Sequence, residues 1–119
     1  LGILYQICDL QFEGCYMFLK NHRYIFINQN LPEHEQRLVM AHELGHAILH
    51  RKENCYFIRN KTLLLNSKKE IEANKFAMEL LLPDSFFTEY RDFTIDQISR
   101  MTGYHQKLIE LKLENERRK

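Results

Sequence analysis

The chain has 119 residues and a formal net charge of +1, with 45% hydrophobic and 12% aromatic residues. This length supports one domain with a core of its own, and the apolar and aromatic content excludes an intrinsically disordered chain. The near-zero charge argues against a dedicated nucleic-acid-binding protein, and no apolar run approaches the roughly 18 residues of a membrane span.

Residues 1–30 are rich in residue types that form strands. Three short runs predict strands at residues 3–8, 15–19 and 24–28. The polar stretch 20–23, between the second and third runs, predicts a turn. Because the connections are short, we expect a small antiparallel sheet, a meander with one buried face.

A helix follows over about residues 32–50, where apolar residues recur at helical spacing. Asn30 is a candidate N-cap, and Pro32 suits the first turn of such a helix. Residues 51–66 give a mixed pattern, in which a short strand at 55–58 and a packed loop both stay open.

Further helical segments complete the chain. Ser67-Lys68-Lys69-Glu70 has the form of a capping box and opens a second helix that ends at Pro83. Residues 84–90 predict one short turn of helix. A second capping box at 94–97 opens a helix that ends at Gly103, and a last helix follows.

Strands followed by helices indicate the α+β class. We expect one domain over residues 1–119, with the sheet in 1–30, a two-helix site in 31–83 and helices in 84–119. Residues 94–113 faintly resemble a helix-turn-helix, but the weak charge favours a C-terminal helical pair that closes the core. Three cysteines without CxxC spacing are typical of free thiols, which predicts a cytoplasmic protein.

His42-Glu43-Leu44-Gly45-His46 is an HExxH motif on the first predicted helix. Histidines four residues apart are about 6 Å apart along the helix axis and about 40° apart around it, so both can reach one ion. Zinc accepts imidazole nitrogen and, in a catalytic site, keeps one position open for water. A carboxylate beside the first ligand can take a proton from that water. The motif therefore predicts His42 and His46 as metal ligands and Glu43 as the catalytic base.

A catalytic zinc ion usually has a third protein ligand. His50 is about 12 Å from His42 along a continuous helix, which is too far to share one ion. Glu70 and Glu72 compete on the second helix, where they lie about 200° apart, so only one can face the ion. We favour Glu70, because Asn74 one turn later can hold a ligand histidine by its second ring nitrogen.

Isolated polar residues complete the candidate set. We expect His22, His34 and His105 at the surface. Tyr90, Tyr104 and His105 have the chemistry of oxyanion stabilisers, but no spacing connects them to the motif.

Two stretches resemble the ImmA/IrrE family of metallopeptidases: residues 39–50, which read VMAHELGHAILH, and residues 70–83, which read EIEANKFAMELLLP. Both motifs in this order are strongly specific, and the resemblance covers about residues 2–83. It implies a zinc peptidase of gluzincin-like layout. The HExxH histidines and a glutamate of the second helix would bind the ion, and the HExxH glutamate would be the base.

The resemblance further implies an intracellular endopeptidase that cleaves a helix-turn-helix repressor of a prophage or mobile element. We expect one catalytic Zn²⁺ ion, although Mn²⁺ or Fe²⁺ also suits such a ligand set. The expected partner is a protein, with no direct contact to nucleic acid or membrane, and the oligomeric state stays open. The alternative is a zinc-containing regulatory module that binds the repressor and relieves repression without cleavage. The presence of Glu43 favours the enzyme, since a structural zinc site needs no base.

Overall fold

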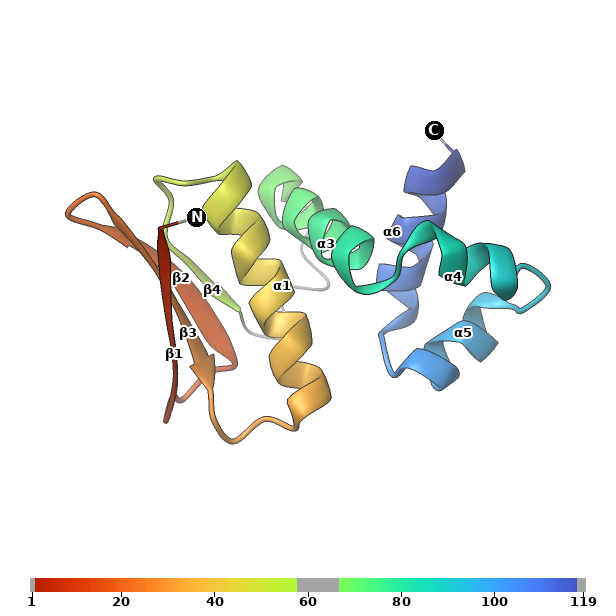
Figure 1. Ribbon diagram of the computed structural model, residues 1–119, viewed down its shortest axis with the longest axis horizontal. Coiled ribbons are helices and arrows are strands. Elements are labelled where there is room, and N and C mark those ends of the chain that lie inside the picture. The colour runs from red at the N-terminus through yellow and green to blue at the C-terminus, as the bar shows by residue number, and fades with distance from the viewer. Residues whose placement is uncertain (1, 58–66, 118–119) are drawn as a thin grey trace.

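The computed structural model describes residues 2–57 and 67–117. A sheet, two long helices and a group of C-terminal helices follow one another along the longest axis of the molecule (Figure 1). The sheet comes first in the chain and the helices dominate the rest, so the predicted α+β class is confirmed. None of the helices in these ranges is long and apolar enough to cross a membrane.

Four strands form the sheet in the order β1-β3-β2-β4. Their bounds are Ile3–Cys8 for β1, Gly14–Leu19 for β2, His22–Asn28 for β3 and Cys55–Phe57 for β4. β2 and β3 form an antiparallel hairpin whose turn residues, Lys20 and Asn21, have φ angles of 50° and 64°. Such left-handed turns match the twist of the flanking strands. β4 pairs antiparallel with β2, so of the two alternatives for residues 55–58, a short strand or a packed loop, the strand is correct. Ile58 itself lies outside the described residues.

The expected antiparallel meander is wrong for β1, which pairs parallel with β3. The connection over residues 9–13 carries the chain past the position that β3 later fills between β1 and β2. The Asn28 side chain donates hydrogen bonds to the carbonyl oxygens of Leu10 and Phe12, each 3.1 Å long. These bonds fix the connection against the end of β3. β3 therefore lies between β1 and β2, the two strands that a meander would have paired with each other.

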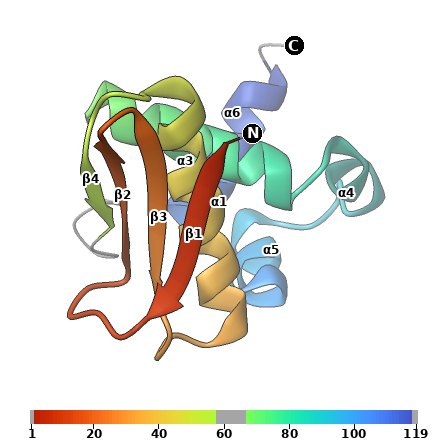
Figure 2. The same ribbon diagram turned by 60° about the vertical axis from the view of Figure 1, so that its left-hand side comes forward.

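α1 (Glu33–Leu49) crosses one face of the sheet (Figure 2). The side chains buried between helix and sheet are Tyr16, Ile25, Ile27, Val39 and Ala47. The predicted Asn30 cap is wrong, because Pro32 is the N-cap residue and makes no side-chain cap bond. The Asn30 side chain instead donates to Oδ1 of Asp9 at 2.9 Å, which ties the loop before α1 to the loop after β1.

α3 (Lys68–Leu81) lies along α1 on the side away from the sheet (Figure 1). The remaining helices are α4 (Asp84–Glu89), α5 (Ile95–Thr102) and α6 (Gln106–Arg117). The capping box of Thr94 and Gln97 and the left-handed Gly103 at the end of α5 are confirmed. The box predicted for α3 is wrong: Ser67 is the N-cap but makes no side-chain cap bond, and the Glu70 side chain points to His42 and His46 of α1.

A second buried cluster joins the C-terminal helices to α1 and α3. Its members are Leu38, Met78, Leu82, Ile98, Tyr104, Leu108 and Ile109. Beside it, the fully buried Lys112 places Nζ 2.8 Å from Oε2 of Glu79 and 2.8 Å from Oδ1 of Asp84. These ion pairs connect α6 to α3 and α4, and α5 and α6 close the helical core as expected.

Candidate metal centre

The HExxH residues lie on the inner face of α1, between α3 and the sheet. His42 is 1% exposed, and Glu43 and His46 are completely buried. Gly45, within the same motif, lies against Ala73 and Phe76 of α3. Because residue 45 has no side chain, α3 comes close enough to α1 for its first turn to reach the two histidines.

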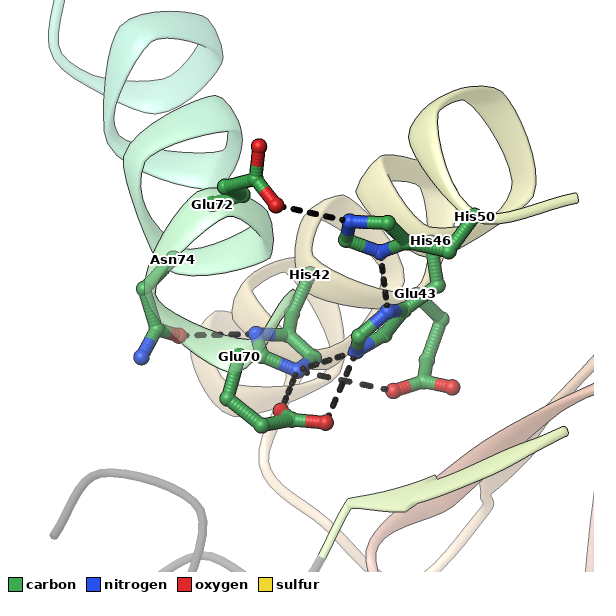
Figure 3. A network of polar contacts seen from close by, with 7 residues as sticks. All are labelled: His42, Glu43, His46, His50, Glu70, Glu72 and Asn74. Atoms are coloured by element: carbon green, nitrogen blue, oxygen red, sulfur yellow. Dashed lines mark hydrogen bonds and ion pairs between the residues drawn. The ribbon is translucent and has the colours of Figure 1, made fainter. Parts of the chain in front are cut away.

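Three of the predicted site residues come together around one point (Figure 3). Nε2 of His42 lies 2.9 Å from Oε2 of Glu70, and Nε2 of His46 lies 3.1 Å from Oε1 of Glu70. The two Nε2 atoms are 3.2 Å apart. One ligand atom from each residue falls within 4.8 Å of the others, so the three side chains form the kind of cluster that holds a metal ion.

Glu72, the alternative third ligand, lies outside this cluster. Its Oε1 atom is 3.2 Å from Nε2 of His50, and its side chain is 43% exposed. Glu70 and Glu72 therefore occupy different sides of α3, as their angular separation predicts, and Glu70 is the one that faces His42 and His46.

A further contact holds each of the two histidines from behind. Nδ1 of His42 lies 2.7 Å from Oδ1 of Asn74, so the predicted contact between Asn74 and a histidine of the motif is present. Nδ1 of His46 lies 2.9 Å from Nδ1 of His50. His50 is the C-cap residue of α1. Sequence reasoning excluded it as a ligand but missed this contact, although its spacing of four residues from His46 was a usable signal.

The proton positions in the cluster make it suitable for a cation. Oδ1 of Asn74 can only accept a hydrogen bond, so the proton of a neutral His42 lies on Nδ1 and Nε2 presents a lone pair. That lone pair faces Nε2 of His46 and the carboxylate of Glu70. Two imidazole nitrogens and one carboxylate are a ligand set of catalytic zinc sites, and the donor set therefore fits a divalent metal ion.

Burial controls the electrostatics of the centre. Desolvation lowers the pKa of His42, which favours the neutral ring that a metal requires. Burial and the nearby charge of Glu70 raise the pKa of Glu43 well above its ordinary value. Burial alone would raise the pKa of Glu70, but its close contacts with His42 and His46 outweigh it and lower that pKa to about 2. Burial, with the charge of Glu43, raises the pKa of Cys15 to about 11, so its thiol is neutral.

Neither carboxylate oxygen of Glu43 has a hydrogen-bond partner among the described residues, although both are buried. Oε1 of Glu43 lies 3.9 Å from Nε2 of His42, beyond hydrogen-bond distance (Figure 3). A buried carboxylate without a partner is costly to fold. Its position beside the cluster indicates a group kept available for a molecule that binds there.

The remaining isolated candidates lie elsewhere. His22 and His105 are exposed, as expected. The surface prediction for His34 holds only in part: the residue is half-buried, its ring stacks on Tyr104 with the centroids 4.6 Å apart, and its Nε2 atom is buried. Tyr104 thus belongs to the C-terminal core, and Tyr90 packs against Phe86 of α4 and against Phe93 in the loop that follows it.

Comparison with known proteins adds a family match to this geometry. Residues 1–103 match the family model described as the IrrE N-terminal-like domain. The chain is 46% identical over 101 residues to "Uncharacterized immunity region protein 2" of Bacillus phage phi105, covering 83% of this chain and 64% of the relative. It is 43% identical over 65 residues to "Metallopeptidase ImmA" of Bacillus subtilis (strain 168), covering 55% of this chain and 37% of the relative. The chain thus spans less than two thirds of the length of either relative.

Proposed function

This chain belongs to the ImmA/IrrE family of metallopeptidases, and we propose that it is a zinc-dependent endopeptidase. His42, His46 and Glu70 would hold the ion, and Glu43 would be the catalytic base. The family implies a metal ion, and zinc is the proposed identity because the ligand set suits it. Mn²⁺ and Fe²⁺ can bind the same set, so metal analysis of the purified protein belongs to any test.

One observation carries the proposal: a buried carboxylate, which has no hydrogen-bond partner among the described residues, stands beside a cluster of metal-ligating atoms. The cluster is formed by His42, His46 and Glu70, and the carboxylate is that of Glu43. A purely structural site would need only the first of these features. The second supports chemistry, since a hydrolase needs a base next to the metal.

Each residue of the proposed site would have its own role in peptide hydrolysis. A bound divalent ion supplies Lewis acidity, which polarises the scissile carbonyl and lowers the pKa of the attacking water. Glu43 takes the proton of that water on its carboxylate and delivers it to the leaving nitrogen. Its raised pKa makes it a stronger base than an exposed glutamate. Glu70, with its pKa of about 2, stays ionised throughout as a ligand.

The proposed substrate is a regulatory protein, namely a helix-turn-helix repressor of a prophage or mobile element. The relative from phage phi105 is named for an immunity region, and this name supports a regulatory setting for the chain. A protease for such a repressor would act in the cytoplasm, the location that the cysteine pattern predicts. The C-terminal helices pack into the core, which agrees with a protein partner rather than direct contact to DNA.

Cleavage of the repressor is the direct test. The full-length, zinc-loaded protein is incubated with a candidate helix-turn-helix repressor, and the products are identified by mass spectrometry. We expect new termini with the wild type and none after treatment with a chelator. The Glu43→Gln variant keeps all three proposed ligands, and we expect it to leave the repressor intact.

Two outcomes would contradict the proposal. Cleavage by Glu43→Gln at the wild-type rate would remove Glu43 from the mechanism. An intact repressor that nevertheless leaves its operator DNA when the protein is added would identify the alternative, a regulatory module that acts by binding.

A further inference from the structure

We infer that His50 and Glu72 are positioning residues that hold His46 in the tautomer needed for metal binding. The inference rests on the proposed function, because it takes His46 as a metal ligand through Nε2. Neither residue touches the proposed ion position, since the cluster of ligand atoms comprises only His42, His46 and Glu70 among the described residues.

The three side chains form a continuous line of polar contacts (Figure 3). Nδ1 of His46 lies 2.9 Å from Nδ1 of His50, and Nε2 of His50 lies 3.2 Å from Oε1 of Glu72. The His50 side chain is only 7% exposed, whereas that of Glu72 is 43% exposed. The line therefore begins in the buried centre and ends at a carboxylate in contact with solvent.

Only one arrangement of protons satisfies this line when His46 binds a metal ion. A ligating Nε2 must offer its lone pair, so the proton of His46 lies on Nδ1. That N–H can donate to Nδ1 of His50 only if this atom is unprotonated. The His50 proton then lies on Nε2 and is donated to the Glu72 carboxylate, which can only accept. The carboxylate thus selects the tautomer of His50, and His50 selects the tautomer of His46.

The backbone places His50 for this contact. As C-cap of α1 it has φ −130° and ψ 51°, outside the helical range, while its N–H still bonds to the carbonyl oxygen of His46 at 2.7 Å. The ring consequently lies beside that of His46, with the centroids 5.1 Å apart. Glu72, on α3, then ties the end of α1 to the second helix.

The two proposed histidine ligands are therefore supported by different chemistry. His42 donates to the neutral amide oxygen of Asn74. His46 instead contacts the His50 imidazole, which in turn contacts the Glu72 carboxylate. Partners of this kind orient a ligand histidine and raise its basicity, and their loss typically weakens metal binding about 10- to 100-fold.

Metal affinity of the full-length protein, measured by competition with a chelator for Zn²⁺ and by the absorption of bound Co²⁺, tests the inference. His50→Phe keeps a ring but no acceptor, and we expect about 10- to 100-fold weaker binding and an altered Co²⁺ spectrum. His50→Gln restores an acceptor for His46 and should recover most of the affinity. Glu72→Gln should weaken binding less than His50→Phe, because its amide oxygen still accepts. His22→Phe and Glu110→Gln, both at exposed positions, are the matched controls.

Thermal unfolding of the metal-free variants separates this role from a merely structural one. We expect His50→Gln and Glu72→Gln to unfold like the metal-free wild type, and ¹H–¹⁵N spectra of the zinc-loaded wild type to show a proton on Nδ1 of His46. Wild-type affinity and an unchanged Co²⁺ spectrum in both His50→Phe and Glu72→Gln would overturn the inference alone. A wild-type protein that binds no divalent ion would overturn the proposed function together with it.

Discussion

A Cβ atom at Gly45 would lie 3.2 Å from both the Cα atom and the carbonyl oxygen of Ala73. The backbones of α1 and α3 are therefore in direct contact at this point, one residue before His46. The spacing between the two helices depends on this contact rather than on adjustable side chains. It decides how far the Glu70 carboxylate stands from the two histidines.

Side chains added at position 45 should separate the helices and weaken the centre. We expect Gly45→Val to cost about 1–3 kcal/mol of stability through overpacking and to weaken zinc binding. Gly45→Ala should be milder, because alanine regains about 1 kcal/mol of helix propensity. Urea unfolding and chelator competition measure both effects. Ile48→Val, at an exposed position of the same helix, is the control, and a Gly45→Val protein with unchanged zinc affinity would refute the argument.

Glu43 should destabilise the metal-free protein at neutral pH. Burial raises the pKa of its carboxyl in the folded state above the value of 4.5 that it has when exposed. A group of this kind contributes stability below the lower pKa and loses it as the pH rises through the higher one. We therefore expect metal-free Glu43→Gln to melt several degrees above the wild type at pH 7–8, with the difference shrinking toward pH 4.5. Glu110→Gln is the control, and a difference independent of pH would exclude this cause.

Removal of the metal ion should loosen the pair of central helices. The three proposed ligands come from α1 and α3, so a bound ion stabilises only the folded arrangement. At a free zinc concentration of 100 times Kd, binding contributes about 2.7 kcal/mol, which corresponds to roughly 10 °C in Tm for a domain of this size. Differential scanning fluorimetry with and without chelator measures it. Glu70→Gln should lose most of the zinc-induced rise in Tm. A wild-type protein whose Tm does not change with zinc would contradict the proposed site.

Gly103 should be intolerant of a side chain for two separable reasons. Its φ of +79° is left-handed, and a Cβ would lie 2.9 Å from Nε2 of His34. We expect Gly103→Ala to cost about 1–2 kcal/mol through the backbone alone, with the contact adding to it. In a double-mutant cycle, the Gly103→Ala cost should be smaller in a His34→Ala background. Equal losses of stability in the wild-type and His34→Ala backgrounds would exclude a contribution from the contact with His34.

Local signals in the sequence predicted the helices well, together with several contacts among the proposed site residues. The HExxH spacing brings His42 and His46 to one face whatever the rest of the fold does. Asn74, one turn after Glu70, was predicted to hold a histidine, and its contact with His42 confirms this. The Thr94 capping box also formed as predicted, because all of its contacts lie within one turn.

The predictions failed where distant segments compete for the same group. Ser67 and Glu70 have the sequence of a capping box, but the Glu70 carboxylate binds the histidines of another helix instead. Asn30 likewise bonds to Asp9 rather than capping α1. The parallel pairing of β1 depends on where β3 returns in space, which no local pattern records. The link from His50 to Glu72 was missed for the same reason.

Glu70 and Glu79, near opposite ends of α3, make this helix a rigid link between the candidate metal centre and the C-terminal helices. Glu70 meets the histidines of α1 near the start of α3, and Glu79 meets the buried Lys112 of α6 nine residues later, a distance of about 13 Å along one helix. A force that displaces α6 must therefore tilt α3 or break the ion pair. The C-terminal helices, which contribute no member of the ligand cluster among the described residues, still help to determine how firmly Glu70 is presented.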